Sequence, residues 1–274
     1  IGGIMTNSIA ILSDALHDFG DSFALGLAWY FQKVSARKPT AEYTYGYKRF
    51  SLLSAFINSV ILLSGSTFVL YESVKRIINP AETNAQGMFI LAILGVIVNG
   101  AAILRLKKGN SVNERVVSLH LLEDVLGWIA VLIVSIIMIF TNIPVLDPIL
   151  SVAISFYILF NVYKNLKTVF SVILQAKPEN IDEVMIAGGM DVDETAIKKQ
   201  LEAFTEVKEI HDLHIWTMDS EYHVLTVHLV LNANINTEEQ KSLRTRVHQL
   251  LKNLDIEHAT IEFEYEDEVC EWCE

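Results

Sequence analysis

Cysteine and basic residues are both scarce in this chain. Its 274 residues include two cysteines, Cys270 and Cys273, which cannot form the disulfide framework of a small scaffold. Lysine and arginine number 21 against 33 acidic residues, a net charge of −12. The imbalance falls on residues 177–274, which hold 8 basic and 23 acidic residues. We therefore expect no nucleic-acid partner, because phosphate binding needs a basic face.

Motifs of membrane-embedded metalloenzymes are also missing. An intramembrane zinc protease would carry His-Glu-x-x-His and a di-metal carboxylate enzyme would carry Glu-x-x-His repeats, and neither run occurs. The sequence begins Ile1-Gly2-Gly3 with no charged segment, so it does not resemble a signal peptide. We expect these first residues to be the end of a hydrophobic span that starts before residue 1. An enzyme is therefore not predicted.

The rest of the sequence divides into an apolar part and the acidic part. Five apolar runs approach the roughly 20 residues that cross a bilayer as a helix, namely 9–31, 50–71, 87–104, 125–141 and 145–163. Any one of them could be a buried core helix, but five with short connections predict a membrane bundle. With a stub at 1–6 they make six helices. We predict a transmembrane domain at 1–176 and a cytoplasmic domain at 177–274.

Orientation follows from the basic residues between the spans. Apart from Lys75 and Arg76, they lie in alternate connections: Lys33, Arg37, Lys38, Lys48 and Arg49 in the first, Arg105, Lys107, Lys108 and Arg115 in the second, and Lys164, Lys167 and Lys177 after the last span. Lys75 and Arg76 lie in one of the other connections and argue modestly against the orientation that this pattern indicates. The positive-inside rule places the acidic domain in the cytoplasm of a multi-pass protein, which we expect in the inner or plasma membrane.

Ionisable residues inside the spans are energetically expensive and therefore candidates for function. One spacing occurs twice, as His17-x-x-x-Asp21 and His120-x-x-x-Asp124. Residues four apart share one helix face, so two such helices offer two imidazoles and two carboxylates. These are the four ligands of a tetrahedral zinc site. The alternative is a local His–Asp hydrogen bond within each helix.

Other polar residues near the spans have simpler interpretations. Asp14, one turn before Asp18, is expected either to line an access path or to cap a helix end. Asp147, directly before Pro148, is expected to begin a helix. Asn58 and Asn99 are expected to form interhelical hydrogen bonds.

The sequence resembles the cation diffusion facilitator family of divalent-metal/proton antiporters. The resemblance covers nearly the whole chain and is carried by residues 8–18 (Ser-Ile-Ala-Ile-Leu-Ser-Asp-Ala-Leu-His-Asp), 45–49 (Tyr-Gly-Tyr-Lys-Arg), 119–124 (Leu-His-Leu-Leu-Glu-Asp), 147–149 (Asp-Pro-Ile) and 211–216 (His-Asp-Leu-His-Ile-Trp). It implies a homodimer with six transmembrane helices per protomer and a cytoplasmic domain similar to a metallochaperone. It also implies that His17, Asp21, His120 and Asp124 form the transport site.

The acidic part has the pattern of a small α+β domain. Helices are predicted at 191–204, capped by Asp191 or Asp193, and at 237–254, where Thr237 as cap and Gln240 fit a capping box. Alternating residues predict strands at 207–218, 222–231 and 257–265, the first two joined as a hairpin. The order αββαβ is that of a ferredoxin-like domain, in agreement with the resemblance.

Six of the eight histidines lie in this domain. Across the hairpin His211 can approach His228, and Glu262 and Glu264 share one face of the last strand. The resemblance implies a metal site at the dimer interface formed by these histidines and the end of the last strand. The wider set of candidate ligands is His211, His228, His258, Glu262, Glu264, Cys270 and Cys273. Ordinary surface histidines and a redox cysteine pair are the alternatives, and His223 and His248 are assigned to the surface.

These features together predict a function in metal transport. The predicted activity is export of Zn2+ from the cytoplasm in exchange for protons, by alternating access. Two imidazoles favour Zn2+ over Mn2+ or Mg2+, while Cd2+ and Co2+ fit similar ligands. Zn2+ would be the transported substrate and also the regulatory ligand of the cytoplasmic site. The alternative function is a metal-sensing membrane receptor with the C-terminal domain as its output.

Overall fold

The computed structural model describes residues 2–106, 112–178, 194–219, 221–232 and 235–265. The chain forms two compact units. The first comprises Ile1–Tyr30 and Ser54–Leu166, and the second comprises Phe31–Leu53 and Lys167–Glu274.

Helices make up the first unit, as the apolar runs predict, and three of them extend by a few residues into the second. The helices are α1 (Gly2–Thr6), α2 (Ile9–Ser35), α3 (Phe50–Ile78), α4 (Ala85–Leu106), α5 (Val112–Thr141) and α6 (Leu146–Ile173). Among the described residues, four helices, α3 to α6, are long and apolar enough to cross a membrane. The α2 helix has 27 residues, a sufficient length, but its charged residues lower its apolar character. The predicted helical membrane domain is thus confirmed.

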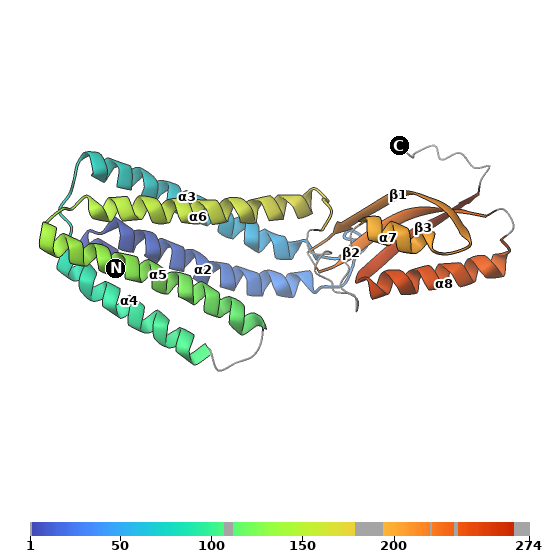
Figure 1. Cartoon of the computed structure of the whole chain (residues 1–274), viewed down its shortest axis with the longest axis horizontal. Helices are drawn as coiled ribbons and strands as arrows, with labels where there is room; N and C mark the ends of the chain where they lie inside the picture. Colours follow the sequence, from blue (N-terminus) through green and yellow to red (C-terminus); the bar gives the residue numbers. More distant parts are fainter. Residues whose placement is uncertain (1, 107–111, 179–193, 220, 233–234, 266–274) are drawn as a thin grey trace. The chain divides into compact units, whose positions relative to one another are not determined.

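Small residues and apolar clusters hold the helices together. In Figure 1, α4 lies beside α5 and α3 lies beside α6. A Cβ atom on Gly95 of α4 would lie 2.1 Å from the Trp128 ring of α5, so only glycine permits this close approach. An apolar cluster joins Leu62 of α3 to Ile158 and Val162 of α6. Interhelical van der Waals packing of this kind stabilises helix pairs where lipid surrounds them.

Asp147 ties the start of α6 to the start of α2. It lies in the first turn of α6, as predicted, and is fully buried. Its carboxylate accepts hydrogen bonds from Ser8 Oγ at 2.5 Å and from the backbone N–H groups of Ile9 and Ala10 at 2.8 and 3.2 Å. Asp147 therefore also caps the N-terminus of α2, whose first N–H groups lack partners within the helix.

Arg76, one of the two basic residues that do not fit the predicted membrane orientation, has a local role at the end of α3. Its guanidinium donates a hydrogen bond to the Asn7 carbonyl at 2.7 Å and lies 3.6 Å from Glu72. The Asn7 amide in turn donates to the Glu82 carbonyl at 2.8 Å. The charge of Arg76 thus serves to join helix ends.

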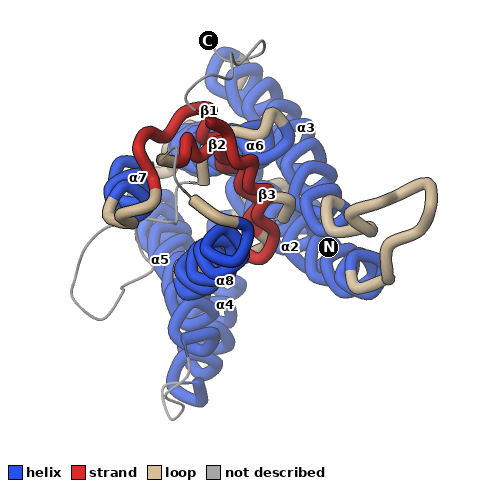
Figure 2. The backbone as a smooth tube through the Cα atoms, turned by 90° about the vertical axis from the view of Figure 1, so that its right-hand side faces the viewer, coloured by secondary structure: helices blue, strands red, loops and turns tan. Residues whose placement is uncertain are grey.

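The second unit contains the predicted αββαβ domain. Its elements are α7 (Glu194–Glu202), β1 (Val207–Thr217), β2 (His223–Leu231), α8 (Thr237–Asn253) and β3 (Ile256–Tyr265). The sheet order is β1-β2-β3, with β2 antiparallel to β1 and parallel to β3. The two helices share one apolar core with the sheet, which includes Leu201, Leu229 and Leu243. Figure 2 shows α7 and α8 beside the three strands. Alternate β2 residues, among them His228, therefore face away from this core.

Two details of this domain differ from the predictions. The N-cap of α8 is Asn236 rather than Thr237. The Asn236 side chain accepts from Glu238 and Glu239, and the Glu239 carboxylate accepts from the Asn236 backbone N–H. The motif is thus shifted by one residue, because Thr237 already has helical conformation. His223 is buried rather than at the surface. The predicted caps of the first helix, Asp191 and Asp193, lie outside the described residues.

The corrected capping box gives a direct stability prediction. Asn236→Ala removes the acceptor of two backbone N–H groups and should destabilise the domain by about 1 kcal/mol. For a domain of this size the melting temperature should fall by roughly 4–8 °C. Thermal unfolding followed by circular dichroism measures the change. Thr237→Ala is the matched control and should shift the transition little; the opposite ranking would restore Thr237 as the cap.

Candidate metal centres

The α2 helix places several ionisable side chains on one face. Asp14, His17 and Asp21 follow one another at spacings of three and four residues, one helical turn each. His17 Nε2 lies 3.5 Å from Asp21 Oδ2, and both side chains are about three-quarters buried. This is the contact that the His-x-x-x-Asp spacing predicts.

A second helix, α5, reaches the same carboxylate. His120 Nε2 lies 3.1 Å from Asp21 Oδ2, and the His17 and His120 rings meet edge-on with centroids 6.0 Å apart. Two turns further along α5, a Cβ atom on Gly127 would lie 3.9 Å from Asp14 Oδ1. Residue numbers therefore fall along α2 as they rise along α5, and the two helices run antiparallel (Figure 1). Asp21 bridges the helices, so the contact is more than a local His–Asp pair.

A cavity of about 360 Å³ adjoins these residues. Its polar wall consists of Asp14, His17, Glu123 and Asp124, whereas α6 contributes mainly apolar side chains. Asp14 Oδ2 and His17 Nδ1 are buried and have no hydrogen-bond partner in the described part of the chain. Buried polar atoms are normally paired, so an unpaired acceptor on a cavity wall is a candidate ligand for a cation or its water. Asp14 lines the cavity, one of its two predicted roles.

The four residues of the predicted transport site are brought near one another to different degrees. His17, Asp21 and His120 are in contact, with atom separations close to the roughly 3–4 Å between neighbouring ligands of a tetrahedral zinc ion. Asp124 shares only the cavity wall with His17. In the described residues, three candidate ligand atoms lie within 4.8 Å of one another only in the second unit. The candidate ligand atoms of the α2–α5 group are therefore more widely spaced than those of the group in the second unit.

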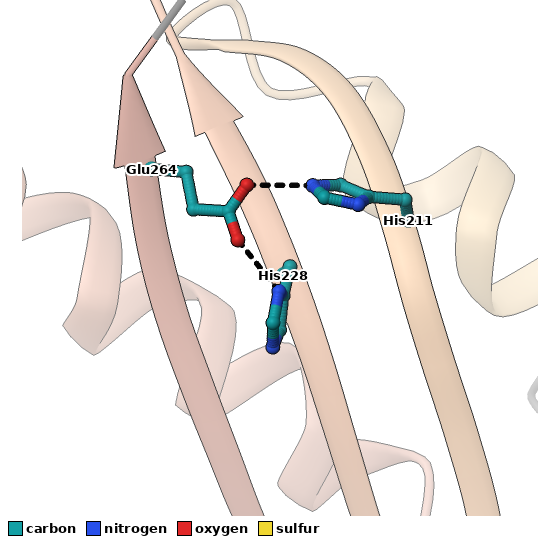
Figure 3. Close-up of side chains that lie close together, drawn as sticks. All are labelled: His211, His228 and Glu264. Carbon is teal, nitrogen blue, oxygen red and sulfur yellow. Dashed lines mark hydrogen bonds and ion pairs between the residues drawn. The ribbon is translucent and has the colours of Figure 1, made fainter. Parts of the chain in front are cut away.

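The closely spaced group in the second unit consists of His211, His228 and Glu264 and lies on the sheet. His211 pairs with His228 across β1 and β2, as the hairpin pattern predicts. Glu264 on β3 is buried; its Oε2 lies 2.7 Å from His211 Nε2, and its Oε1 lies 2.6 Å from His228 Nδ1. Figure 3 shows the carboxylate placed between the two imidazoles. Two nitrogens and one carboxylate on adjacent strands form three ligands of a type that zinc binds.

Sequence reasoning missed one member of this surface, Asp212. Its carboxylate lies 2.9 Å from His214 Nε2 and 3.5 Å from His228 Nε2. Strict alternation would place Asp212 on the face opposite His211. A β-bulge between His211 and His214, with Asp212 at a positive φ of 50°, changes this direction. The available signal was an acidic residue between two histidines, a pattern that does not by itself reveal a bulge.

The remaining predicted ligands lie at or beyond the edge of this group. Glu262 is 66% exposed and its carboxylate lies 3.5 Å from His228 Nε2. His258 lies near the other end of β3, opposite Val224, so the structure does not bring it to the histidine pair. Cys270 and Cys273 lie outside the described residues.

Both the helical part and the acidic part of the chain match known protein families. The family model described as cation efflux transmembrane domain matches residues 1–174, and the model described as cation efflux protein, cytoplasmic domain, matches residues 190–266. The predicted boundary at 176/177 stays a prediction.

Curated relatives match nearly the full length of the chain. A cadmium, cobalt and zinc/H(+)-K(+) antiporter of Bacillus velezensis is 35% identical over 268 residues, which are 96% of this chain and 82% of the relative. The metal cation efflux system protein CzcD of Cupriavidus metallidurans is 34% identical over 266 residues, 96% and 80% of the two chains. The zinc transporter ZitB of Yersinia pestis is 34% identical over 271 residues, 97% and 82% of the two chains.

Proposed function

The chain belongs to the cation diffusion facilitator family of cation efflux transporters, and from this premise we propose that it exports Zn2+ from the cytoplasm in exchange for protons. It is a multi-pass membrane transporter rather than an enzyme, and its C-terminal domain is cytoplasmic. The observation that carries the proposal is the contact of Asp21 with both His17 and His120, beside a cavity lined by carboxylates. These three residues and Asp124 are the proposed ligands of the transported ion.

The ligand chemistry supports zinc as the substrate. Two imidazole nitrogens with two carboxylates suit a borderline metal better than Mg2+ or Mn2+, which prefer oxygen ligands. Cd2+ and Co2+ accept similar sets of ligands, and the name of the Bacillus velezensis relative includes all three metals. The wide spacing of the candidate ligand atoms in the α2–α5 group also supports transport, because an ion held by four closely set ligands would leave slowly.

Exchange with protons follows from the same ligands. Zn2+ binds neutral imidazole, so its arrival displaces any proton from His17 or His120. If the site faces each side of the membrane in turn, these side chains carry metal outward and protons inward. The name of the Bacillus velezensis relative, an antiporter, supports this part of the proposal.

Flux measurement tests the proposal against the sensor alternative. Proteoliposomes containing the chain and a trapped zinc-sensitive dye should accumulate Zn2+ faster when the lumen is acidic than when no proton gradient is present. Protein-free liposomes give the leak rate. Metal binding without flux would reject transport and favour a metal-sensing receptor.

Ligand softness predicts the effect of His120→Asp. Replacing an imidazole that contacts Asp21 by a carboxylate adds oxygen and charge, which favours harder metals. The Zn2+/Mn2+ flux ratio should fall by about tenfold, equivalent to about 1.4 kcal/mol of relative binding free energy. Competition flux assays measure the ratio. The exposed α8 histidine gives the control, His248→Asp. Equal ratios in both variants and the parent chain would reject softness as the basis of selection.

The group on the sheet is the proposed regulatory site. His211, His228 and Glu264 supply three ligands, and Asp212 or Glu262 lies close enough to contribute a fourth. We place this site at a homodimer interface, where bound Zn2+ would offset part of the repulsion between two acidic domains. A metal there would report cytoplasmic zinc to the transporter.

A further inference from the structure

A basic cavity lies at the α2–α3 connection, and none of the residues of the two metal centres lines it. It has a volume of about 670 Å³ and belongs wholly to the second unit. Residues of the connection, including Arg37, Lys38 and Lys48, form one wall, and Tyr222, directly before β2, and His258 of β3 form the other. None of these residues has a part in the proposed transport or regulatory chemistry.

A tight turn brings the two ends of the connection together. The Gly46 N–H and the Thr40 N–H both donate to the Tyr43 carbonyl, at 2.9 and 3.0 Å. Gly46 has a φ of 77°, and a Cβ atom there would lie 3.2 Å from the Arg37 carbonyl. Glycine is required on both counts. The turn thereby holds Lys48 on the same cavity wall as Arg37 and Lys38.

Among the described residues, the cations of this cavity share its walls with no carboxylate. No acidic residue lines the cavity, and Glu42, the one carboxylate between residues 31 and 53, is not among its walls. In the described part of the chain, Arg37, Lys38 and Lys48 form no salt bridge. Lys48 Nζ lies 4.1 Å from the centre of the Tyr222 ring, a cation–π contact that leaves the ammonium hydrogens available. Three positive charges thus converge in a unit whose residues 177–274 carry a net −15.

Neutral hydrogen-bond donors complete the walls. Burial raises the pKa of the Tyr222 phenol, and the nearby Glu257 carboxylate adds to the rise, so the O–H remains a donor. The Glu257 carboxylate itself accepts the His223 backbone N–H at 2.7 Å. His258 meets the Tyr45 ring edge-on, with centroids 5.4 Å apart. Cations and donors facing one space, without a carboxylate on the wall, select an anion with several acceptor oxygens, as a phosphate has.

We propose that this cavity binds a phosphate group and that its source is the headgroup of an anionic phospholipid. The connection joins α2 directly to α3, a helix long and apolar enough to cross a membrane, so its basic residues lie close to a surface of the bilayer. Anionic lipids concentrate at the cytoplasmic surface, and clustered basic residues attract them. A headgroup held between the connection and the sheet would link the metal-binding domain to the membrane.

The test titrates the detergent-solubilised full chain with short-chain phosphatidylglycerol, short-chain phosphatidylcholine and sodium phosphate. Calorimetry should show saturable phosphatidylglycerol binding and much weaker phosphatidylcholine binding. Arg37→Gln/Lys38→Gln/Lys48→Gln should weaken phosphatidylglycerol binding on the order of 100-fold, because each basic residue contributes about a factor of five. The control Lys198→Gln/Lys199→Gln/Lys252→Gln removes the same charge from exposed helix positions and should leave affinity nearly unchanged.

A milder variant guards against misfolding of the triple variant. Tyr222→Phe keeps the ring under Lys48 and removes one donor, so affinity should fall several-fold with an unchanged melting temperature. Equal losses in the cavity and control triple variants would overturn the proposal, because binding would then depend on net charge alone. Sodium phosphate that binds as tightly as the lipid and displaces it would overturn the headgroup as the source.

Discussion

His17→Ala and Asp124→Ala are each expected to abolish Zn2+ flux while the chain still inserts and folds. His17 contacts the carboxylate that also holds His120, and Asp124 lines the cavity beside it. Loss of a supporting residue alone lowers metal affinity 10–100-fold, so loss of a direct ligand should lower flux by at least about 100-fold. Insertion should be unaffected, because neither change makes its span less apolar.

Initial Zn2+ flux into proteoliposomes, normalised to inserted protein, measures this effect. Size-exclusion chromatography and thermal unfolding show whether each variant remains folded. His248→Ala and Glu202→Ala likewise remove an imidazole and a carboxylate, from exposed positions on α8 and α7, and these variants should transport normally. Near-parental flux from either His17→Ala or Asp124→Ala would remove that residue from the site. Near-parental flux from both would reject the site itself.

The elements of the fold were predictable because they depend on local patterns. Long apolar runs gave α3 to α6, and alternation gave the three strands in the right order. The error at α8 arose between two adjacent residues that both favour the N-cap position. Asn236 with Glu239 and Thr237 with Gln240 both fit the spacing of a capping box. The conformation of the local backbone decides between them.

Features of the sites that depend on distant contacts were harder to predict. The spacing of four placed His17 beside Asp21, because helical geometry is regular. No local pattern indicates that Asp147 caps a helix that begins near residue 9, since the partners are 137 to 139 residues apart. The direction of Asp212 depends on a bulge, which interrupts the alternation on which the strand prediction relied.

Glu264→Gln is expected to remove the cytoplasmic metal without removing transport. The Glu264 carboxylate lies within 2.7 Å of both imidazoles, so it is the one ligand that joins β1, β2 and β3. Glutamine keeps the shape of the side chain and one acceptor oxygen, but it replaces the other oxygen by an NH2 donor and loses the charge that a cation needs. Zn2+ affinity should fall by at least about 100-fold, the upper range for loss of a supporting residue. Stability without metal should change little.

Metal counting needs a chain with a single centre, so the experiment uses His17→Ala as its background. Equilibrium dialysis should give one Zn2+ per chain in this background, and none at the same free Zn2+ after Glu264→Gln is added. Glu209→Gln, an exposed substitution on β1, is the control and should retain the metal. Affinity should also decline as the pH falls through the histidine range, roughly 7 to 6, because protons then compete for the imidazoles.

Two further measurements separate regulation from transport. Zn2+ should tighten dimerisation in sedimentation experiments, because each shared ion offsets part of the charge of two domains at −15, and Glu264→Gln should remove this effect. In the chain with an intact His17, Glu264→Gln should lower the rate of flux or its sensitivity to zinc without eliminating it. Unchanged metal content and dimerisation would show that His211 and His228 are ordinary histidines paired with a carboxylate. Complete loss of flux in a folded Glu264→Gln chain would instead make this site part of transport itself.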